Sequence, residues 1–183
     1  MTTEKCPGCG GRFSGIEGMT HSYMDAAPGC WSVFGELLAR ELADPACYDV
    51  HYLTIDAYAA QHPGKATKKG VQSMALHLVR LCAQLEFELV PLDANRAMQQ
   101  AGEHREKFVW LVPPANRGTL TVADVRSARS AIEYTRLVKA WASEVWQAWA
   151  AHHATIRQWL VADGGTVSGD RSSTQGRGSP AAD

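Results

Sequence analysis

No stretch of this sequence is apolar over the roughly 20 residues that a membrane-spanning helix requires. Its first residues, Met-Thr-Thr-Glu-Lys, also lack the hydrophobic segment of a secretion signal. Neither sign of charge dominates, because 18 Lys and Arg stand against 19 Asp and Glu. A chain without a net field does not attract nucleic acid or an acidic membrane over long range. These absences predict a cytoplasmic protein outside the membrane and argue against a nucleic-acid partner. A small molecule or another protein stays open as the partner.

Cysteine is scarce, and its count of five is odd. Disulfides are rare in the cytosol, so we do not expect these residues to form structural cross-links. Cys47 and Cys82 stand alone in apolar sequence and are expected to be small core residues. The other three, Cys6, Cys9 and Cys30, call for a separate explanation.

The length of 183 residues and the hydrophobic content of 45% suit one domain with one core. Residues 1–30 contain many glycines and few large aliphatic side chains, which favours loop over helix. Residues 163–183 are rich in Gly, Ser, Thr and Arg and are predicted to be a disordered tail. We therefore expect an all-α helical bundle over residues 1–162, with residues 1–30 as a metal-binding segment.

Apolar residues recur at helical spacing in three parts of the chain. The first part predicts a helical hairpin over residues 31–62, interrupted by Asp44-Pro45 because proline cannot continue a helix. The second predicts a helix over 71–90. The third, over 121–162, contains neither Gly nor Pro and predicts a long Trp-rich helix, straight or bent. Residues 108–112 fit either a short strand or an extended apolar segment.

A metal site is the most specific prediction of the sequence. Cys6 and Cys9 form a Cys-x-x-Cys turn, which can direct two sulfurs at one zinc ion. Cys30 follows after 20 intervening residues, at the start of the first predicted helix. Each helix of the predicted hairpin is about 13 residues, or roughly 20 Å, so antiparallel packing would return His62 to Cys30. The predicted zinc ligands are therefore Cys6, Cys9, Cys30 and His62.

Two other histidines compete for the fourth position. His51 would lie at the opposite end of the hairpin, on the order of 15–20 Å from Cys30 by the helical rise. His21 lies in the flexible amino-terminal segment, so its place in the sequence sets no barrier. The geometry favours His62 over His51, and His21 stays open as an alternative.

Other functions fit the same residues. Cys6 and Cys9 could be a redox dithiol, although the strand and helix that flank such motifs are missing. A metal-dependent hydrolase or transferase is a further alternative, because polar side chains lie in apolar helical sequence and could line a common cleft. These catalytic candidates are His21, Asp56, His77, His152 and His153. Each histidine taken singly is better explained as a core imidazole bonded to a backbone carbonyl.

Several short motifs carry a family resemblance. They are Cys-Pro-Gly-Cys-Gly from Cys6, Pro-Gly-Cys-Trp around Cys30, and Asp-Ala-Tyr-Ala-Ala-Gln-His-Pro-Gly from Asp56. Together they resemble a bacterial family of uncharacterised, zinc-finger-like helical proteins, over about residues 5–162. The resemblance implies a shared metal site. It places Cys6, Cys9, Cys30, His51, Tyr58, Gln61 and His62 among the positions that the family keeps. It implies no particular reaction.

Overall fold

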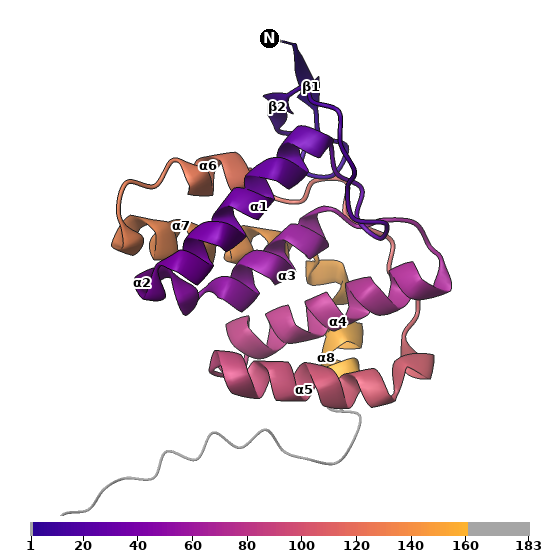
Figure 1. Cartoon of the computed structure of the whole chain (residues 1–183). Coiled ribbons are helices and arrows are strands. Elements are labelled where there is room, and N and C mark those ends of the chain that lie inside the picture. The colour runs from indigo at the N-terminus through magenta and orange to yellow at the C-terminus, as the bar shows by residue number, and fades with distance from the viewer. Residues whose placement is uncertain (1, 161–183) are drawn as a thin grey trace, which may run out of the picture.

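The computed structural model describes residues 2–160 and shows a mostly helical fold with one small hairpin at its amino-terminal end (Figure 1). Strands β1 (Thr3–Lys5) and β2 (Arg12–Ser14) pair antiparallel, with Glu4 opposite Phe13. Phe13 is buried and β2 packs against the first helix. The expectation of loop throughout residues 1–30 is therefore corrected. Three-residue strands are too short to be stable alone, so the hairpin depends on what holds it.

The predicted helical hairpin consists of α1 (Pro28–Ala43), α2 (Pro45–Tyr48) and α3 (His51–Gln61). Helix α1 begins earlier than predicted, because Pro28 supplies the fixed φ that suits the first helical position. Helix α2 is a separate single turn, started by the Asp44 side chain, which accepts the backbone N–H of Ala46 at 3.0 Å. Figure 1 shows α3 running back along α1 toward the β-hairpin.

Helix α4 (Lys68–Leu85) begins before residue 71 and ends before residue 90, the two ends of the predicted range. Thr67 caps its first turn, with the Gly70 N–H donating to the threonine hydroxyl at 3.1 Å. Beyond the helix end, Glu88 takes a left-handed conformation with φ of 52°, and the Leu89 N–H donates to the Ala83 carbonyl at 3.0 Å. Helix α5 (Pro91–Glu103) was not predicted, since Leu92 and Met98 are its only large apolar side chains. A short 3₁₀ turn, η1 (Arg105–Lys107), follows it, and residues 108–112 are extended without a strand assignment.

The long Trp-rich helix predicted over 121–162 is present as α7 (Ala131–Ala148), but the structure divides this range into several elements. The structure has α6 (Val122–Arg126), α7, the 3₁₀ turn η2 (Ala150–His152) and α8 (His153–Leu160). Thr121 and Asp124 form a reciprocal capping box at the start of α6.

Side-chain caps break this region although it has no glycine or proline. Ser130 starts α7 by accepting the backbone N–H of Glu133 at 3.1 Å. At the other end, the Trp146 carbonyl accepts the Trp149 N–H at 2.9 Å, and it also lies 2.9 Å from Nε2 of His153. The chain continues there as the tighter 3₁₀ turn η2, and the His153 ring is a second partner of the Trp146 carbonyl.

The core centres on α3 and α4. Helix α3 packs against α4 and α7, α4 packs against α5 and α8, and α1 packs against α6. Trp141 and Trp149 are fully buried, and their indole N–H groups bond to α3. Trp141 donates to the Gln61 side chain at 3.0 Å, and Trp149 donates to the Ala60 carbonyl at 3.1 Å. The carboxyl-terminal helices therefore fix the end of α3, where His62 lies.

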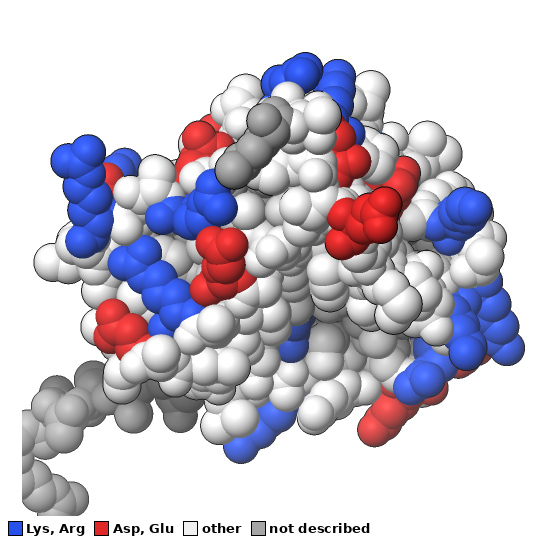
Figure 2. All heavy atoms as spheres, turned by 45° about the horizontal axis from the view of Figure 1, so that its top comes forward, with Lys and Arg blue, Asp and Glu red and all other residues white. Residues whose placement is uncertain are grey.

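Acidic and basic residues are interspersed on the face that carries the amino-terminal segment (Figure 2). No helix within residues 2–160 has the length and apolarity needed to cross a bilayer. The predicted disordered tail, 163–183, lies outside the residues that the structure describes.

Candidate metal centre

The turn between β1 and β2 positions the first two cysteines. The Cys6 N–H donates to the Gly11 carbonyl at 2.8 Å, and the Gly10 N–H donates to the Cys6 carbonyl at 2.9 Å. Gly10 has a φ of 74°, a left-handed conformation that glycine adopts without strain. This tight turn directs both sulfurs to the same side, toward the start of α1.

The α1–α3 hairpin supplies the other two donors. Cys30 lies in the first turn of α1, and His62 is the residue that ends α3. Residues preceding α1 pair with the chain that follows α3: the Asp25 N–H donates to the His62 carbonyl at 3.1 Å, and Met24 forms a β-bridge with Pro63. The antiparallel return of α3 thus brings an imidazole to a thiol 32 positions away.

These four residues form one compact cluster. One potential ligand atom from each of Cys6, Cys9, Cys30 and His62 lies within 4.8 Å of all the others. The Cys9 and Cys30 sulfurs are 3.9 Å apart, and the Cys30 sulfur is 3.4 Å from Nε2 of His62. Cys6, Cys30 and His62 are fully buried, while Cys9 is partly exposed. Three sulfurs and one ring nitrogen at this separation could hold a metal ion.

Tyr58 orients two of the donors. Its backbone carbonyl lies 2.7 Å from Nδ1 of His62, which places the ring hydrogen on Nδ1 and leaves Nε2 to face the sulfurs. Its hydroxyl donates to the Cys30 sulfur at 3.6 Å, and its ring stacks on both His62 and Phe34. Burial is the main effect that raises the pKa of Tyr58, and the nearby Cys30 sulfur raises it further. The hydroxyl therefore keeps its proton and remains a donor.

The three sulfurs lie so close together that they cannot all be thiolates unless a positive charge lies among them. Hydrogen bonds from Cys30 and then Cys9 lower the pKa of Cys6, whereas Cys6 and then Cys9 raise the pKa of Cys30. A hydrogen bond from Cys30 acts to lower the pKa of Cys9, but Cys6 and burial outweigh it, so the pKa of Cys9 is raised. Three thiolates at this separation need a cation among them.

Arg117 is a neighbour of the cluster that the sequence did not reveal. Its Nη1 donates to the Gly8 carbonyl, within the Cys6–Cys9 turn, at 2.6 Å. Burial lowers the pKa of Arg117, while Asp25, Cys6 and Cys9 act to raise it. A guanidinium here offsets negative charge on the sulfurs. No local signal marks it, because it comes from the loop before α6, more than 100 residues along the chain.

A family model described as "Family of unknown function (DUF5946)" matches residues 4–150. The chain belongs to this family. The matched range contains all four cluster residues and every helix from α1 to α7. The resemblance to an uncharacterised family is therefore confirmed, and DUF5946 brings no established activity. No curated protein and no solved structure matches the chain.

The other two histidines considered as ligands lie outside the cluster of this DUF5946 chain. His51 begins α3, and its Nδ1 is 2.7 Å from the fully buried carboxylate of Glu41. Thr54 and Tyr134 also donate to Glu41. His21 accepts the Tyr23 N–H at Nδ1, at 3.3 Å, and its ring contacts Trp31. Both have partners other than the sulfurs.

The catalytic candidates fall into two separate places. His77 lies 2.9 Å from the buried Asp56 carboxylate, and it lines a groove that His21 also lines. His152 instead lies 2.9 Å from the Val112 carbonyl, and His153 lies against Trp146, both beyond the end of α7. Among the described residues, the DUF5946 chain has one group of three or more His, Cys, Asp or Glu side chains placed to share an ion. That group is the Cys6 cluster.

Gly8 allows the turn to close on His62. A Cβ added at Gly8 would lie 2.2 Å from Cδ2 of His62 and 2.6 Å from the Asp25 carbonyl oxygen. We expect Gly8→Ala to lower the free energy of unfolding by about 1–3 kcal/mol or more and to weaken metal retention, because the turn must move away from His62. Urea unfolding and metal content measure both effects.

Gly35→Ala is the matched control. A Cβ at Gly35 meets nothing within 4 Å, and the residue lies inside α1. Here we expect about 0.5–1 kcal/mol of stabilisation with full metal content, since alanine favours helix over glycine. Equal destabilisation by both substitutions would contradict a specific contact at Gly8.

Proposed function

We propose that this DUF5946 protein binds one zinc ion through Cys6, Cys9, Cys30 and His62, and that the ion is structural. The observation that carries the proposal is the convergence of these four donors within 4.8 Å, three of them fully buried. The donor set of three thiolates and one imidazole is among the commonest of structural zinc sites. Thiolates also disfavour the hard cations Mg²⁺ and Ca²⁺.

Charge balance supports a divalent ion. Three thiolates and a neutral imidazole around Zn²⁺ carry a net charge of −1 by simple addition, and Arg117 lies beside the turn. Backbone N–H groups contribute as well, since Ala27 donates to the Cys6 sulfur at 3.4 Å. These contacts satisfy the thiolates in the way that surrounding hydrogen bonds do in known zinc sites.

The site connects three separate segments of the chain, which supports a structural role for the ion. The site links the β1–β2 turn to the start of α1 and to the end of α3, and four protein ligands complete a tetrahedral zinc. The hairpin contributes few buried apolar side chains of its own, chiefly Phe13. Metal binding would supply the free energy that this segment cannot gain from packing.

Metal analysis of the full chain, combined with X-ray absorption at the bound element, tests the proposal. We expect one equivalent of zinc per chain, with about three sulfur neighbours at roughly 2.3 Å and one nitrogen at roughly 2.0 Å. An oxygen-rich shell would indicate an open or different site. Absence of bound metal after zinc is supplied in excess would refute zinc binding.

Tyr58→Phe tests the contacts that surround the ligands. The substitution removes the hydroxyl that donates to Cys30 and keeps the ring that stacks on Phe34 and His62. We expect zinc affinity to fall about 10–100-fold, measured by competition with a chelator. Tyr134→Phe is the control, because its hydroxyl bonds to Glu41 instead. The control should lower stability without changing zinc affinity, and equal losses of affinity would contradict the role of Tyr58.

Two other functions make different predictions for the same residues. A redox dithiol requires Cys6 and Cys9 to be free, so stoichiometric metal on both sulfurs would exclude it. A metal-dependent hydrolase or transferase requires a substrate site, which His21 and His77 could border, since they line the same groove. A cytoplasmic location suits zinc thiolates, because that compartment keeps thiols reduced.

A further inference from the structure

A second site is suggested by the groove that His21 and His77 share. It is an open groove of about 510 Å³, within the roughly 300–1,000 Å³ typical of small-molecule sites. Its walls come from the loop before α1, from α1, α3 and α4, and from the η1 turn. The residues on which the argument depends are His21, Trp31, Ile55, Lys69, His77 and Arg105.

The floor of the groove is apolar and aromatic. Trp31, Phe34 and Ile55 line it, and the Trp31 ring lies 5.3 Å from Phe34 and 5.8 Å from Tyr58, centroid to centroid. Phe34 is almost fully buried, whereas Trp31 and Ile55 keep part of their surface exposed. Exposed aromatic surface in a concavity suits a flat apolar ligand.

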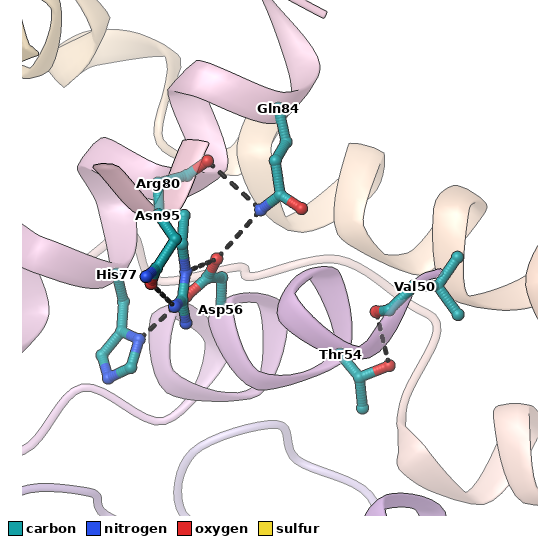
Figure 3. Close-up of polar contacts among 7 residues, drawn as sticks. All are labelled: Val50, Thr54, Asp56, His77, Arg80, Gln84 and Asn95. Carbon is teal, nitrogen blue, oxygen red and sulfur yellow. Dashed lines mark hydrogen bonds and ion pairs between the residues drawn. The ribbon is translucent and has the colours of Figure 1, made fainter. Parts of the chain in front are cut away.

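His77 is held so that one ring nitrogen is available. Its Nδ1 lies 2.9 Å from the carboxylate of Asp56, and Figure 3 shows its other nitrogen pointing away from that carboxylate. Asp56 is fully buried, and it also accepts hydrogen bonds from Arg80, at 2.8 Å through both Nε and Nη2, and from Gln84 at 3.1 Å. In its neutral form His77 therefore donates from Nδ1 and offers the Nε2 lone pair as an acceptor.

His21 has the complementary arrangement. Its Nδ1 accepts the Tyr23 N–H, so in the neutral form its hydrogen is on Nε2, which is a donor. The groove thus has one imidazole that can accept a hydrogen bond and one that can donate. The loop that carries His21 is fixed in place, because Met24 pairs with Pro63.

The charge along the groove is positive. Lys69 and Arg105 line it, and no Asp or Glu is among its described lining residues. Arg105 is anchored by its Nε, which donates to the Gly102 carbonyl at 2.7 Å. Lys69 lies in the first turn of α4, where no acidic residue balances the positive end of the helix dipole. An anionic ligand would supply that balance.

We propose that this groove binds a small aromatic carboxylate that carries a hydroxyl group. The flat ring lies on Trp31 and its apolar neighbours, the carboxylate pairs with Arg105 and Lys69, and the hydroxyl donates to His77. Binding here does not require the metal centre to be zinc, so the two proposals fail or succeed separately.

Fluorescence titration of the full-length protein with hydroxynaphthoate, naphthoate and naphthol tests the site. We expect one-site saturation by the two carboxylates, hydroxynaphthoate binding tighter, and naphthol binding at least about tenfold more weakly than hydroxynaphthoate, because it lacks the charge. Arg105→Gln should weaken carboxylate binding about tenfold and leave naphthol unchanged. The matched control is Arg96→Gln on α5, which pairs with Asp93 outside the groove and should change neither.

A blocking variant distinguishes this groove from other surfaces. Ser73 lines the groove on α4, whereas Ser143 is exposed on α7 and lines a different depression. Ser73→Phe should abolish binding, and Ser143→Phe should retain it, with circular dichroism confirming that both are folded. The proposal is overturned by a lack of saturation with either carboxylate, by full binding to Ser73→Phe, or by naphthol binding as tightly as hydroxynaphthoate.

Discussion

With the proposed zinc at this cluster, Cys30→Ser should abolish metal binding and lower the free energy of unfolding by at least about 3 kcal/mol, out of the roughly 5–15 kcal/mol typical of a domain. Cys30 is fully buried, and its sulfur lies within hydrogen-bonding distance of Cys9, Tyr58 and His62. A serine hydroxyl is a poor zinc ligand, so the remaining three donors would bind the ion far more weakly. The free energy of metal binding, and with it the attachment of the β-hairpin to α1, would then be lost.

Cys47→Ser is the matched control for this substitution. Cys47 is as buried as Cys30, but its sulfur lies 3.5 Å from the Asp44 carboxylate and outside the cluster. We expect it to cost about 1 kcal/mol with full metal content, since serine can make the same hydrogen bond. Metal analysis and urea unfolding of both variants provide the comparison. A Cys30→Ser protein that keeps one equivalent of metal and its unfolding midpoint would rule out the proposed centre.

The second large effect is expected for Asp56→Ala, which should lower the free energy of unfolding by about 3–5 kcal/mol. Asp56 is fully buried and Arg80 is only 6% exposed, so removing the carboxylate leaves a guanidinium inside the protein without its main partner. Figure 3 shows that Asp56 also joins His77 and Gln84, from the facing helix α4. Those donors would lose their acceptor as well.

Asp93→Ala provides the comparison on the surface. Asp93 also pairs with an arginine, Arg96, at 2.9 Å, but both side chains are half-exposed or more. An exposed ion pair contributes at most about 1 kcal/mol, so this variant should be close to wild type in urea unfolding. The double variant Asp56→Ala with Arg80→Met should recover part of the loss, because it removes the unpaired cation. Equal effects of Asp56→Ala and Asp93→Ala would show that burial does not control the strength of the Asp56 pair.

Local pattern was sufficient for part of the fold. The apolar stripes of α1, α3 and α4 and the Asp44-Pro45 interruption could be read directly, because helical periodicity and proline act over a few residues. The breaks on either side of α7 could be read only in part. Ser130-x-x-Glu133 is a recognisable capping pattern. At the other end of α7 the His153 ring nitrogen contacts the Trp146 carbonyl, and no local pattern predicts that contact.

The candidate site divides in the same way. Cys6, Cys9, Cys30 and His62 were predicted together, because a Cys-x-x-Cys turn and two antiparallel helices of similar length impose simple distances. The surroundings were not predicted. Tyr58 acts through both its carbonyl and its hydroxyl, and Arg117 reaches Gly8 from the loop before α6.

The sequence by itself determined the donor residues and the helices that carry them, since spacing and periodicity are local properties of the chain. Only the tertiary structure decided which polar groups meet across distant segments. Those contacts place His77 against Asp56, beside a positively charged groove. They place His152 and His153 elsewhere, beyond the end of α7. The physical reason is that a buried polar side chain takes whichever partner the packing of other helices brings within hydrogen-bonding distance, and no short-range pattern encodes that partner.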